Sequence, residues 1–294
     1  MKPKVYFTKE ISPESVIKMY REVGKELCGR VAVKLHSGEK GNQNFLRPEF
    51  WKPMIDKIGG TVVETNAAYQ GARNTTEKHR QLIEYHGWSR YFDVDLLDEE
   101  GPDIELEVKN GKQLKRNLIG KHLADYDSML VLAHFKGHPF GGYGGALKQL
   151  SIGCASADGK CNIHSGGFDI SRDILKNHRA GLDEFAESMA DAAGTVVDFF
   201  KGNIVYINAM KNLSVDCDCC AIAEDPCMKD IGILSSTDPV AIDQACMDLI
   251  LAANDDPGQK HFIERVESRH GIHTIEAAAE IGYGSREYEL IELD

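Results

Sequence analysis

Short apolar runs alternate with longer amphipathic segments over the first ninety residues of the chain. Residues 31–35 form a nearly continuous apolar run, as buried strands do, and residues 48–58 have helical spacing and end at Gly59-Gly60. This alternation predicts parallel strand–helix–strand units. The expected elements are strands at residues 5–8, 31–35 and 61–65, and helices at residues 12–28, 48–58 and 76–86.

The pattern changes after residue 100. Two runs, residues 104–108 and 114–119, flank Asn110-Gly111, a dipeptide typical of a two-residue hairpin turn. Thr237-Asp238-Pro239 is a helix-start signal, because the Thr237 hydroxyl or the Asp238 carboxylate can cap the helix and proline suits its first turn. The other expected elements are strands at residues 128–133, 204–208, 231–234 and 288–291, and a long amphipathic helix at residues 180–200.

The order of these elements predicts an α/β fold with a mixed, largely parallel sheet flanked by helices. We expect two α/β lobes, at residues 1–125 and 126–294, with one continuous domain as the alternative. The second lobe would carry the two segments whose composition points to chemistry.

Charge and composition narrow the class of partner. The 294 residues include 34 Lys and Arg against 46 Asp and Glu, a formal charge of 34 − 46 = −12. An acidic surface argues against general binding of nucleic-acid phosphates. The N-terminus lacks the apolar core of a signal peptide, and apolar runs such as residues 129–133 are far shorter than the roughly 20 residues that cross a bilayer. We therefore expect a cytoplasmic protein with no nucleic-acid or membrane partner.

Four of the eight cysteines lie within residues 216–227, the cysteine loop. In the cytoplasm, clustered thiols bind metal or carry out redox chemistry more often than they form disulfides. Thiolates select zinc, copper(I) or iron–sulfur clusters. Adjacent cysteines project in different directions, so Cys217, Cys219 and Cys227 are the expected ligands, with Cys220 competing with Cys219.

The glycine-rich loop, residues 137–145, contains five glycines between a predicted strand and a predicted helix. Such a loop can bring backbone N–H groups close to an anion at a helix N-terminus. It matches neither a Walker loop nor a dinucleotide-binding fingerprint. Cations flank it. The candidate cofactor-binding residues are Gly141, Gly142, Gly144, Gly145 and Lys160, and the candidate catalytic residues are His134, Lys136 and Lys148.

Two weaker patterns complete the candidates. Cys161 and His164 have a C-x2-H spacing that suits a shared metal, and Cys154 or Cys161 could instead complete the cluster of the cysteine loop. Lys34 and His36 share one face at the carboxyl end of a predicted strand, where open α/β sheets bind ligands. An ion pair between strands is the alternative role for them.

Several motifs together resemble a bacterial and archaeal family described as uncharacterised Fe–S centre proteins, the domain of unknown function DUF362. The resemblance keeps the family's order over nearly the whole chain and implies an iron–sulfur centre. The matching pieces are Lys34 with Gly38-Glu39, Glu64-Thr-Asn66, GGYGGALK at residues 141–148, GCAS at 153–156, Gly159-Lys160, Cys217-Asp-Cys219, and DIGIL…DPVAID within residues 230–243.

The segment from His134 through Phe140-Gly-Gly to Lys148 is also similar, more distantly, to nickel-pincer lactate racemases. In that family, histidines and a lysine of this region contact a nickel–nucleotide cofactor and a hydroxy-acid substrate. The similarity implies His134 and Lys148 as site residues.

We therefore expect an iron–sulfur protein, with [4Fe–4S] as the cluster, acting in redox or Lewis-acid chemistry with a redox partner or on a small anionic substrate. Lys34, His36, Lys136 and Lys148 would hold the anion. One alternative is a racemase-like enzyme with nickel or another divalent metal. The other is a protein with structural zinc and no catalysis.

Overall fold

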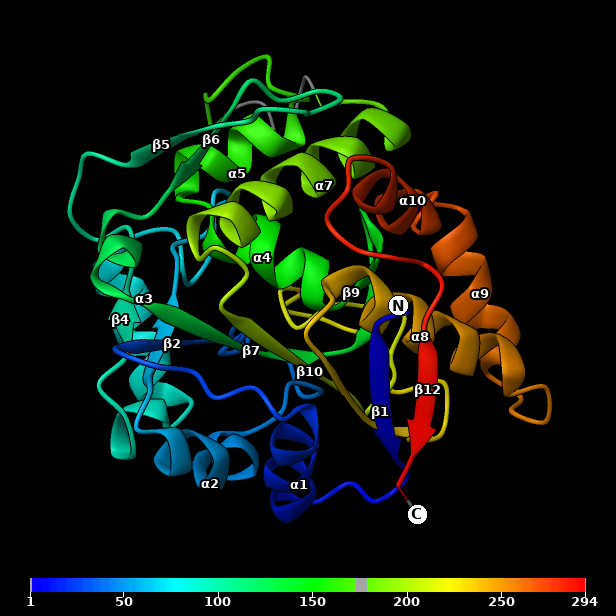
Figure 1. The fold of residues 1–294 in the computed structure, drawn as a ribbon. Coiled ribbons are helices and arrows are strands. Elements are labelled where there is room, and N and C mark those ends of the chain that lie inside the picture. The colour runs from blue at the N-terminus through cyan, green and yellow to red at the C-terminus, as the bar shows by residue number, and fades with distance from the viewer. Residues whose placement is uncertain (1, 173–178, 294) are drawn as a thin grey trace.

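The computed structural model describes residues 2–172 and 179–293. At its centre lies a sheet with the strand order β12–β1–β11–β10–β7–β2–β3–β4 (Figure 1). Strand β11 runs antiparallel to both of its neighbours, and all other neighbouring strands in this sheet are parallel. The strands are β1 (Lys4–Thr8), β2 (Val31–Lys34), β3 (Thr61–Glu64), β4 (Asp95–Leu96), β7 (Ser128–His134), β10 (Ile204–Met210), β11 (Gly232–Ser236) and β12 (Glu289–Glu292).

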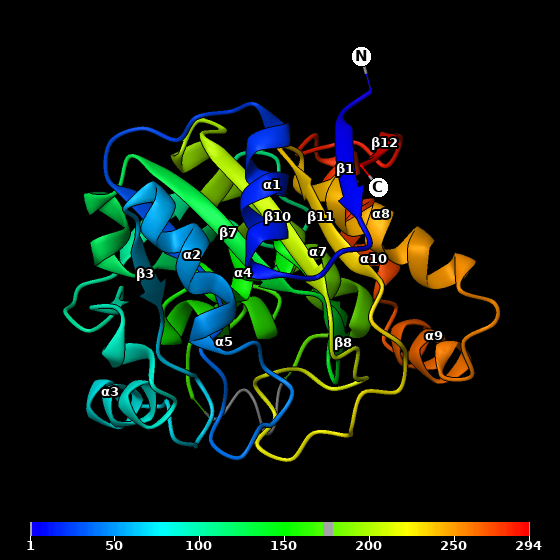
Figure 2. The ribbon, with the colours of Figure 1, turned by 90° about the horizontal axis from the view of Figure 1, so that it is seen from below.

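Helices cover both faces of this sheet, which confirms the predicted α/β fold. Figure 2 shows α1 and α2 crossing one face, while α4, α7, α8 and α10 lie on the other (Figure 1). The helices are α1 (Pro13–Val23), α2 (Pro48–Ile58), α3 (Thr76–Tyr85), α4 (Ala146–Cys154), α5 (Ala157–His164), α7 (Leu182–Phe199), α8 (Pro239–Ala252), α9 (Gln259–Glu267) and α10 (Ile272–Glu280), with 3-10 turns at η1 (Trp88–Arg90) and η2 (Lys121–Asp125).

The central strands are apolar along their whole length because both of their faces are buried. In β7, Leu130 and Leu132 pack into the core beneath α1 and α2, which also contains Trp51. The alternate residues, such as Val131 and Ala133, pack into the core beneath α4 and α8. One strand thus contributes to two cores.

Local signals set most helix ends. Asp238 caps α8 by accepting hydrogen bonds from the backbone N–H groups of Val240 and Ala241, as predicted. Helix α1 ends at Val23, earlier than predicted, because Gly24 takes a left-handed conformation with φ 67°.

The predicted two-residue turn at Asn110-Gly111 is wrong. Strand β5 (Ile104–Glu107) does pair with β6 (Arg116–Ile119), but a long loop joins them. The carboxylate of Asp191, on α7, accepts hydrogen bonds from three successive backbone N–H groups of this loop, at 2.7 to 2.9 Å. A tertiary contact therefore overrides the local turn preference.

The sheet has a topological switch between β7 and β2. The chain leaves β2 for β3 on one side and leaves β7 for β10 on the other, so the connections diverge there. Open α/β sheets bind ligands in the crevice at the carboxyl ends of such strands. The sheet also continues across residue 125, and the division into two lobes stays a prediction.

Across residues 2–172 and 179–293, no helix is both long and apolar enough to cross a membrane. The cytoplasmic location stays a prediction.

Candidate functional site

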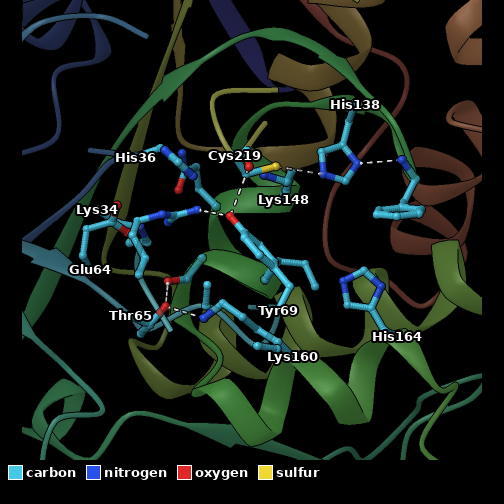
Figure 3. A pocket seen from close by; sticks show the side chains of 17 residues that line it. Lys34, His36, Glu64, Thr65, Tyr69, His138, Lys148, Lys160, His164 and Cys219 are labelled. Atoms are coloured by element: carbon cyan, nitrogen blue, oxygen red, sulfur yellow. Dashed lines mark hydrogen bonds and ion pairs between the residues drawn. The ribbon is translucent and has the colours of Figure 1, made fainter. Parts of the chain in front are cut away.

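A cavity of about 200 Å³ lies at the switch, at the carboxyl ends of β2 and β3 and against α4 and α5 (Figure 3). Polar and cationic residues are more numerous than apolar ones in its lining, whereas carbon atoms make up most of the wall surface that faces the cavity. The lining residues are Lys34, His36, Glu64, Thr65, Ala67, Ala68, Tyr69, Arg73, His138, Phe140, Lys148, Gln149, Ile152, Gly153, Lys160, His164 and Cys219.

Lys34 has both of the roles considered for it, a place in the wall of the cavity and an ion pair between strands. It lines the cavity, and its Nζ also forms a buried ion pair with Glu64 Oε2 at 2.7 Å. Burial alone would raise the pKa of Glu64, but the neighbouring basic groups, Lys34 first among them, together more than offset this and the pKa falls to about 2. The side-chain hydroxyl and backbone N–H of Ser37 donate to the other carboxylate oxygen. The charge of Lys34 is therefore already compensated.

A second ion pair, between Arg73 and Glu39, positions Tyr69, whose hydroxyl contacts the cysteine loop. Arg73 Nε contacts Glu39 Oε2 at 3.1 Å, and Arg73 Nη2 donates to the Tyr69 hydroxyl at 2.6 Å. That hydroxyl lies 2.9 Å from Glu39 Oε2 and 3.1 Å from the carbonyl oxygen of Cys219. The charge of Arg73 is likewise compensated, and Tyr69 holds the loop in place.

Lys160 differs from Lys34 and Arg73. Its side chain is 9% exposed, and its Nζ donates to the Thr65 hydroxyl and to the Ala155 carbonyl, each at 2.6 Å. Both partners are neutral, and no carboxylate of the described residues lies within ion-pair distance of it. Burial lowers the pKa of Lys160 to about 8.

Cys217 and Cys219 lie next to each other beside the cavity. Lys148 Nζ contacts Cys217 Sγ at 3.2 Å, and the backbone N–H of Cys219 points at the same sulfur at 3.5 Å. Cys219 Sγ lies 3.8 Å from His138 Nε2. The ligand atoms of Cys217, Cys219 and His138 all lie within 4.8 Å of one another, so they form a cysteine-containing site that could hold a metal ion.

The side chain between the two cysteines turns the opposite way. Asp218 is buried, and its carboxylate contacts His134 Nδ1 at 2.9 Å and Lys136 Nζ at 2.8 Å. Although burial opposes it, these two groups hold the pKa of Asp218 well below its usual range. His134 Nε2 lies 2.5 Å from the carbonyl oxygen of Lys211, to which it can donate a hydrogen bond. His134 and Lys136 therefore anchor the cysteine loop from behind and do not line the cavity.

Distances test how well a metal fits. Zinc–sulfur bonds of about 2.3 Å and zinc–nitrogen bonds of about 2.0–2.1 Å place tetrahedral ligand atoms roughly 3.6–3.8 Å apart, close to the 3.8 Å between Cys219 and His138. The His138 ring nevertheless has its Nδ1 occupied, because the backbone N–H groups of Phe140 and Gly141 donate to it at 3.2 and 2.8 Å. The neutral ring then carries its proton on Nε2, facing the sulfur.

The remaining candidate ligands fall into three groups. The neighbouring Cys219 thiol lowers the pKa of the Cys220 thiol, so these two side chains interact. Cys227 and Cys154 donate instead to backbone carbonyls at 3.4 Å. Cys161 is buried against Ala68, and His164 lines the cavity while stacking on Phe185 with ring centroids 4.5 Å apart.

The glycine-rich loop forms a small hairpin of β8 (Lys136–His138) and β9 (Gly142–Gly144). At the start of α4, which follows it, the backbone N–H groups of Ala146 and Leu147 donate to Asp243 at 2.8 and 3.0 Å. A Cβ on Gly145 would lie 2.4 Å from the same carboxylate, and one on Gly142 would lie 2.8 Å from Gly271. Packing thus explains two of these glycines, and the cofactor role of the loop stays a prediction.

Some lining residues, such as Ile152, were not among the sequence candidates, although a signal for part of them exists. Lys148 and Ile152 are four residues apart on α4, so they share one helix face, as the two candidates Lys160 and His164 do on α5. Helical spacing could therefore have extended the candidate Lys148 to its cavity neighbour Ile152. Tyr69 lies in a loop and carries no comparable signal.

A family model described as "Domain of unknown function (DUF362)" matches residues 31–248. No match was found among the curated proteins. The chain is similar in structure to the lactate racemase apoprotein of Thermoanaerobacterium thermosaccharolyticum, with a TM-score of 0.44 and 15% identity over 69% of this chain and 50% of that one. It is also similar to a Thermotoga maritima protein solved by a structural genomics consortium, with a TM-score of 0.41 and 9% identity over 91% of this chain and 58% of that one. The chain thus spans about half the length of these structures.

Proposed function

This chain belongs to the DUF362 family, whose model spans most of its length. We propose that it binds a small organic anion in the cavity, beside a metal centre held by cysteine thiols. The main support for this proposal is that the buried ammonium of Lys160 contacts only the neutral Thr65 hydroxyl and Ala155 carbonyl. A buried ammonium with only neutral partners costs folding free energy unless a counter-ion joins it. The cavity in front of it is where such an anion would bind.

Cys217 and Cys219 are the proposed metal ligands. We propose Cys220 as the third thiol in place of Cys227, because the Cys220 and Cys219 side chains interact, whereas Cys227 donates to a backbone carbonyl. Three thiols in C-x-C-C spacing suit iron–sulfur clusters or zinc. An iron–sulfur cluster is our first candidate, because hydrogen bonds to cysteine sulfur, such as those of Lys148 and the Cys219 amide, tune such clusters. When bound, the metal would supply Lewis-acid or electron-transfer chemistry.

The protein's own groups have distinct roles in this proposal. Asp218, fixed from behind by His134 and Lys136, turns the two cysteines toward the cavity. His138 presents its Nε2–H to the Cys219 sulfur, so we assign it as a hydrogen-bond donor and not as a ligand. Lys160 binds the anion.

A proton-transfer reaction of the racemase type is the second candidate function. Its support is that three histidines line the same cavity as neutral rings: burial lowers the pKa of His36 and His138 well below the usual range, and that of His164 to about 3. A neutral imidazole can accept a proton, but a pKa of about 3 makes His164 a weak base near neutral pH. Nickel in the purified protein would favour this candidate.

Metal analysis tests the metal half of the proposal. We would purify the protein without oxygen and measure iron, zinc, nickel and acid-labile sulfide in the wild type and in single Cys-to-Ser variants. Cys217→Ser, Cys219→Ser and Cys220→Ser should lose the metal. Cys227→Ser, the exposed-cysteine control Cys28→Ser, and His138→Ala should keep it. Metal-free wild type, or metal that survives all three loop variants, would refute this half.

A further inference from the structure

We propose that the ligand of the cavity is a carboxylic acid with a single negative charge, whose carboxylate pairs with Lys160 and whose carbon skeleton is otherwise apolar. This inference rests on the proposed anion site and narrows its substrate class. It follows from the charges along the cavity wall, from the hydrogen bonds around Lys160, and from the apolar side chains beside it.

Two of the four cationic side chains in the cavity wall are neutralised by buried carboxylates. Lys34 pairs with Glu64 at 2.7 Å, and Arg73 pairs with Glu39 at 3.1 Å. A ligand that took either cation would leave a buried carboxylate unpaired, at a high cost in free energy. Neither cation is therefore available to a ligand.

The proposed metal centre accounts for the third cation, Lys148. Its Nζ contacts Cys217 Sγ at 3.2 Å. Cysteines bind metal as thiolates. Three thiolates on a dication, whether a divalent ion or an oxidised [4Fe–4S] core, leave one net negative charge. The Lys148 ammonium offsets that charge and so calls for no second charge on the ligand.

The histidines of the wall add no charge. His36 Nδ1 and His138 Nδ1 accept hydrogen bonds from backbone N–H groups at 3.0 and 2.8 Å. A ring nitrogen that accepts a hydrogen bond carries no proton, so both rings are neutral. Burial, with nearby cations, lowers the pKa of His164 to about 3, so this ring is neutral as well. Among the described lining residues, only the charge of Lys160 stays uncompensated, and one negative charge on the ligand balances it.

The hydrogen bonds around Lys160 leave one donor for the ligand. An ammonium has three N–H groups, and two of them donate to the Thr65 hydroxyl and the Ala155 carbonyl. The Thr65 hydroxyl donates its own proton to the Gly153 carbonyl at 3.0 Å, so it cannot donate to the ligand as well. Recognition at Lys160 thus depends on one charged donor, which suits a single carboxylate.

Apolar surface begins next to this ammonium. His164 follows Lys160 by four residues on the same face of α5, and Figure 3 shows the two side chains on the same side of the cavity. Phe140 meets the His164 ring with centroids 5.9 Å apart. A second charged group on the ligand would lose its water here without gaining a partner. The other apolar lining residues are Ala67, Ala68 and Ile152.

Calorimetric titration with three probes tests the inference on wild-type protein, purified with its metal, at pH 7. Acetate has the carboxylate alone, hexanoate adds an apolar chain, and adipate ends that chain in a second carboxylate. Each methylene that moves from water onto an apolar wall strengthens binding by up to about fourfold. Hexanoate should therefore bind at least tenfold more tightly than either acetate or adipate.

Two variants separate the charge from the apolar wall. Lys160→Met should weaken hexanoate binding at least tenfold, whereas Lys121→Met, which removes an exposed lysine outside the cavity, should behave like wild type. Ile152→Asn should weaken hexanoate binding at least threefold and change acetate binding by less than twofold. Leu251→Asn, a similar change at an exposed position of α8, should leave both affinities unchanged.

Lys160→Gln keeps a donor for the Ala155 carbonyl and replaces Lys160→Met if that variant does not fold, and the comparison of probes needs no variant at all. Equal affinities for acetate and hexanoate would overturn the apolar skeleton. Adipate that binds as tightly as hexanoate would overturn the single charge. The anion site would stand in both cases. Hexanoate binding that is unchanged in Lys160→Met would overturn the assigned cation, and if no probe binds, the proposed anion site fails as well.

Discussion

Lys160 is a residue whose charge opposes folding. Its pKa of about 8 lies below the ordinary value of 10.5, chiefly because of burial, with Lys34 and Arg73 adding to the effect and Asp98 and Glu64 opposing it. A difference of about 2.5 pKa units corresponds to roughly 3 kcal/mol. Between pH 8 and 10.5 the unfolded chain binds more protons than the folded one, so the free energy of unfolding rises with pH in this window.

Replacement of Lys160 by methionine should therefore stabilise the protein in the absence of ligand. We expect a gain of about 1–3 kcal/mol at pH 7, because the buried charge is removed, and loss of the rise in stability between pH 8 and 10.5. Urea unfolding at pH 7 and 9.5 measures both effects, with Lys121→Met as the control. A destabilised Lys160→Met protein would mean that the lysine is retained for packing.

Asp218 anchors the cysteine loop, and Asp218→Asn should release it. The change leaves His134 and Lys136 buried without their carboxylate, which costs about 3–5 kcal/mol. Metal content should fall together with stability. Asp225→Asn is the control, since it makes the same change at an exposed position of the same loop. Unfolding curves and metal analysis that match wild type would contradict this role.

The sequence predicted which residues lie at the cavity better than it predicted which residues they contact. Lys34, His36, Lys148, Lys160 and Cys219 were all sequence candidates, and all line it. His134 and Lys136 lie behind it because they contact Asp218, more than 80 residues away. A single sequence holds no signal for a partner at that separation.

Helices and turns could be predicted where residues close in sequence set their ends. Helix α2 begins and ends where the sequence predicts, because Pro48 and Gly59 act locally. The turn at Asn110-Gly111 was wrong because Asp191 holds the loop from another helix. The hairpin of β8 and β9 escaped prediction, since its strands are three residues long and rich in glycine.

The junction between the glycine-rich loop and α4 should tolerate no side chain at Gly145. A Cβ there would come within 2.4 Å of the Asp243 carboxylate that caps α4. Gly145→Ala should lower the free energy of unfolding by about 1–3 kcal/mol. Gly101→Ala is the control, because a Cβ at Gly101 meets nothing within 4 Å. Thermal unfolding of the two variants compares them, and equal stability would show that Asp243 can move aside.

At the scale of the whole molecule, the site joins distant parts of the chain. The Asn42 side-chain amide donates to the carbonyls of Cys217 and Cys220 at 3.2 and 2.9 Å, and the Glu39 amide donates to the Asp218 carbonyl at 2.8 Å. The segment after β2 therefore holds the cysteine loop. A site built in this way depends on the intact sheet.

One cooperative unfolding transition should follow from that sheet. Both tryptophans, Trp51 and Trp88, lie before residue 125, so their fluorescence reports the first predicted lobe, whereas circular dichroism reports the whole chain. Because β7 pairs with β2 on one side and β10 on the other, the two signals should change at the same urea concentration. Two separate transitions would support independent lobes divided near residue 125.

The proposed function depends on the binding of a small anion to the Lys160 ammonium in the cavity. Calorimetric titration of the wild type with succinate, lactate and inorganic phosphate, at pH 7 and pH 10, tests it most directly. We predict that at least one anion binds at pH 7 with one site per chain. Its affinity should fall about a hundredfold at pH 10, two pH units above the pKa of Lys160. Absence of binding at pH 7, or an affinity unchanged at pH 10, would contradict the claim.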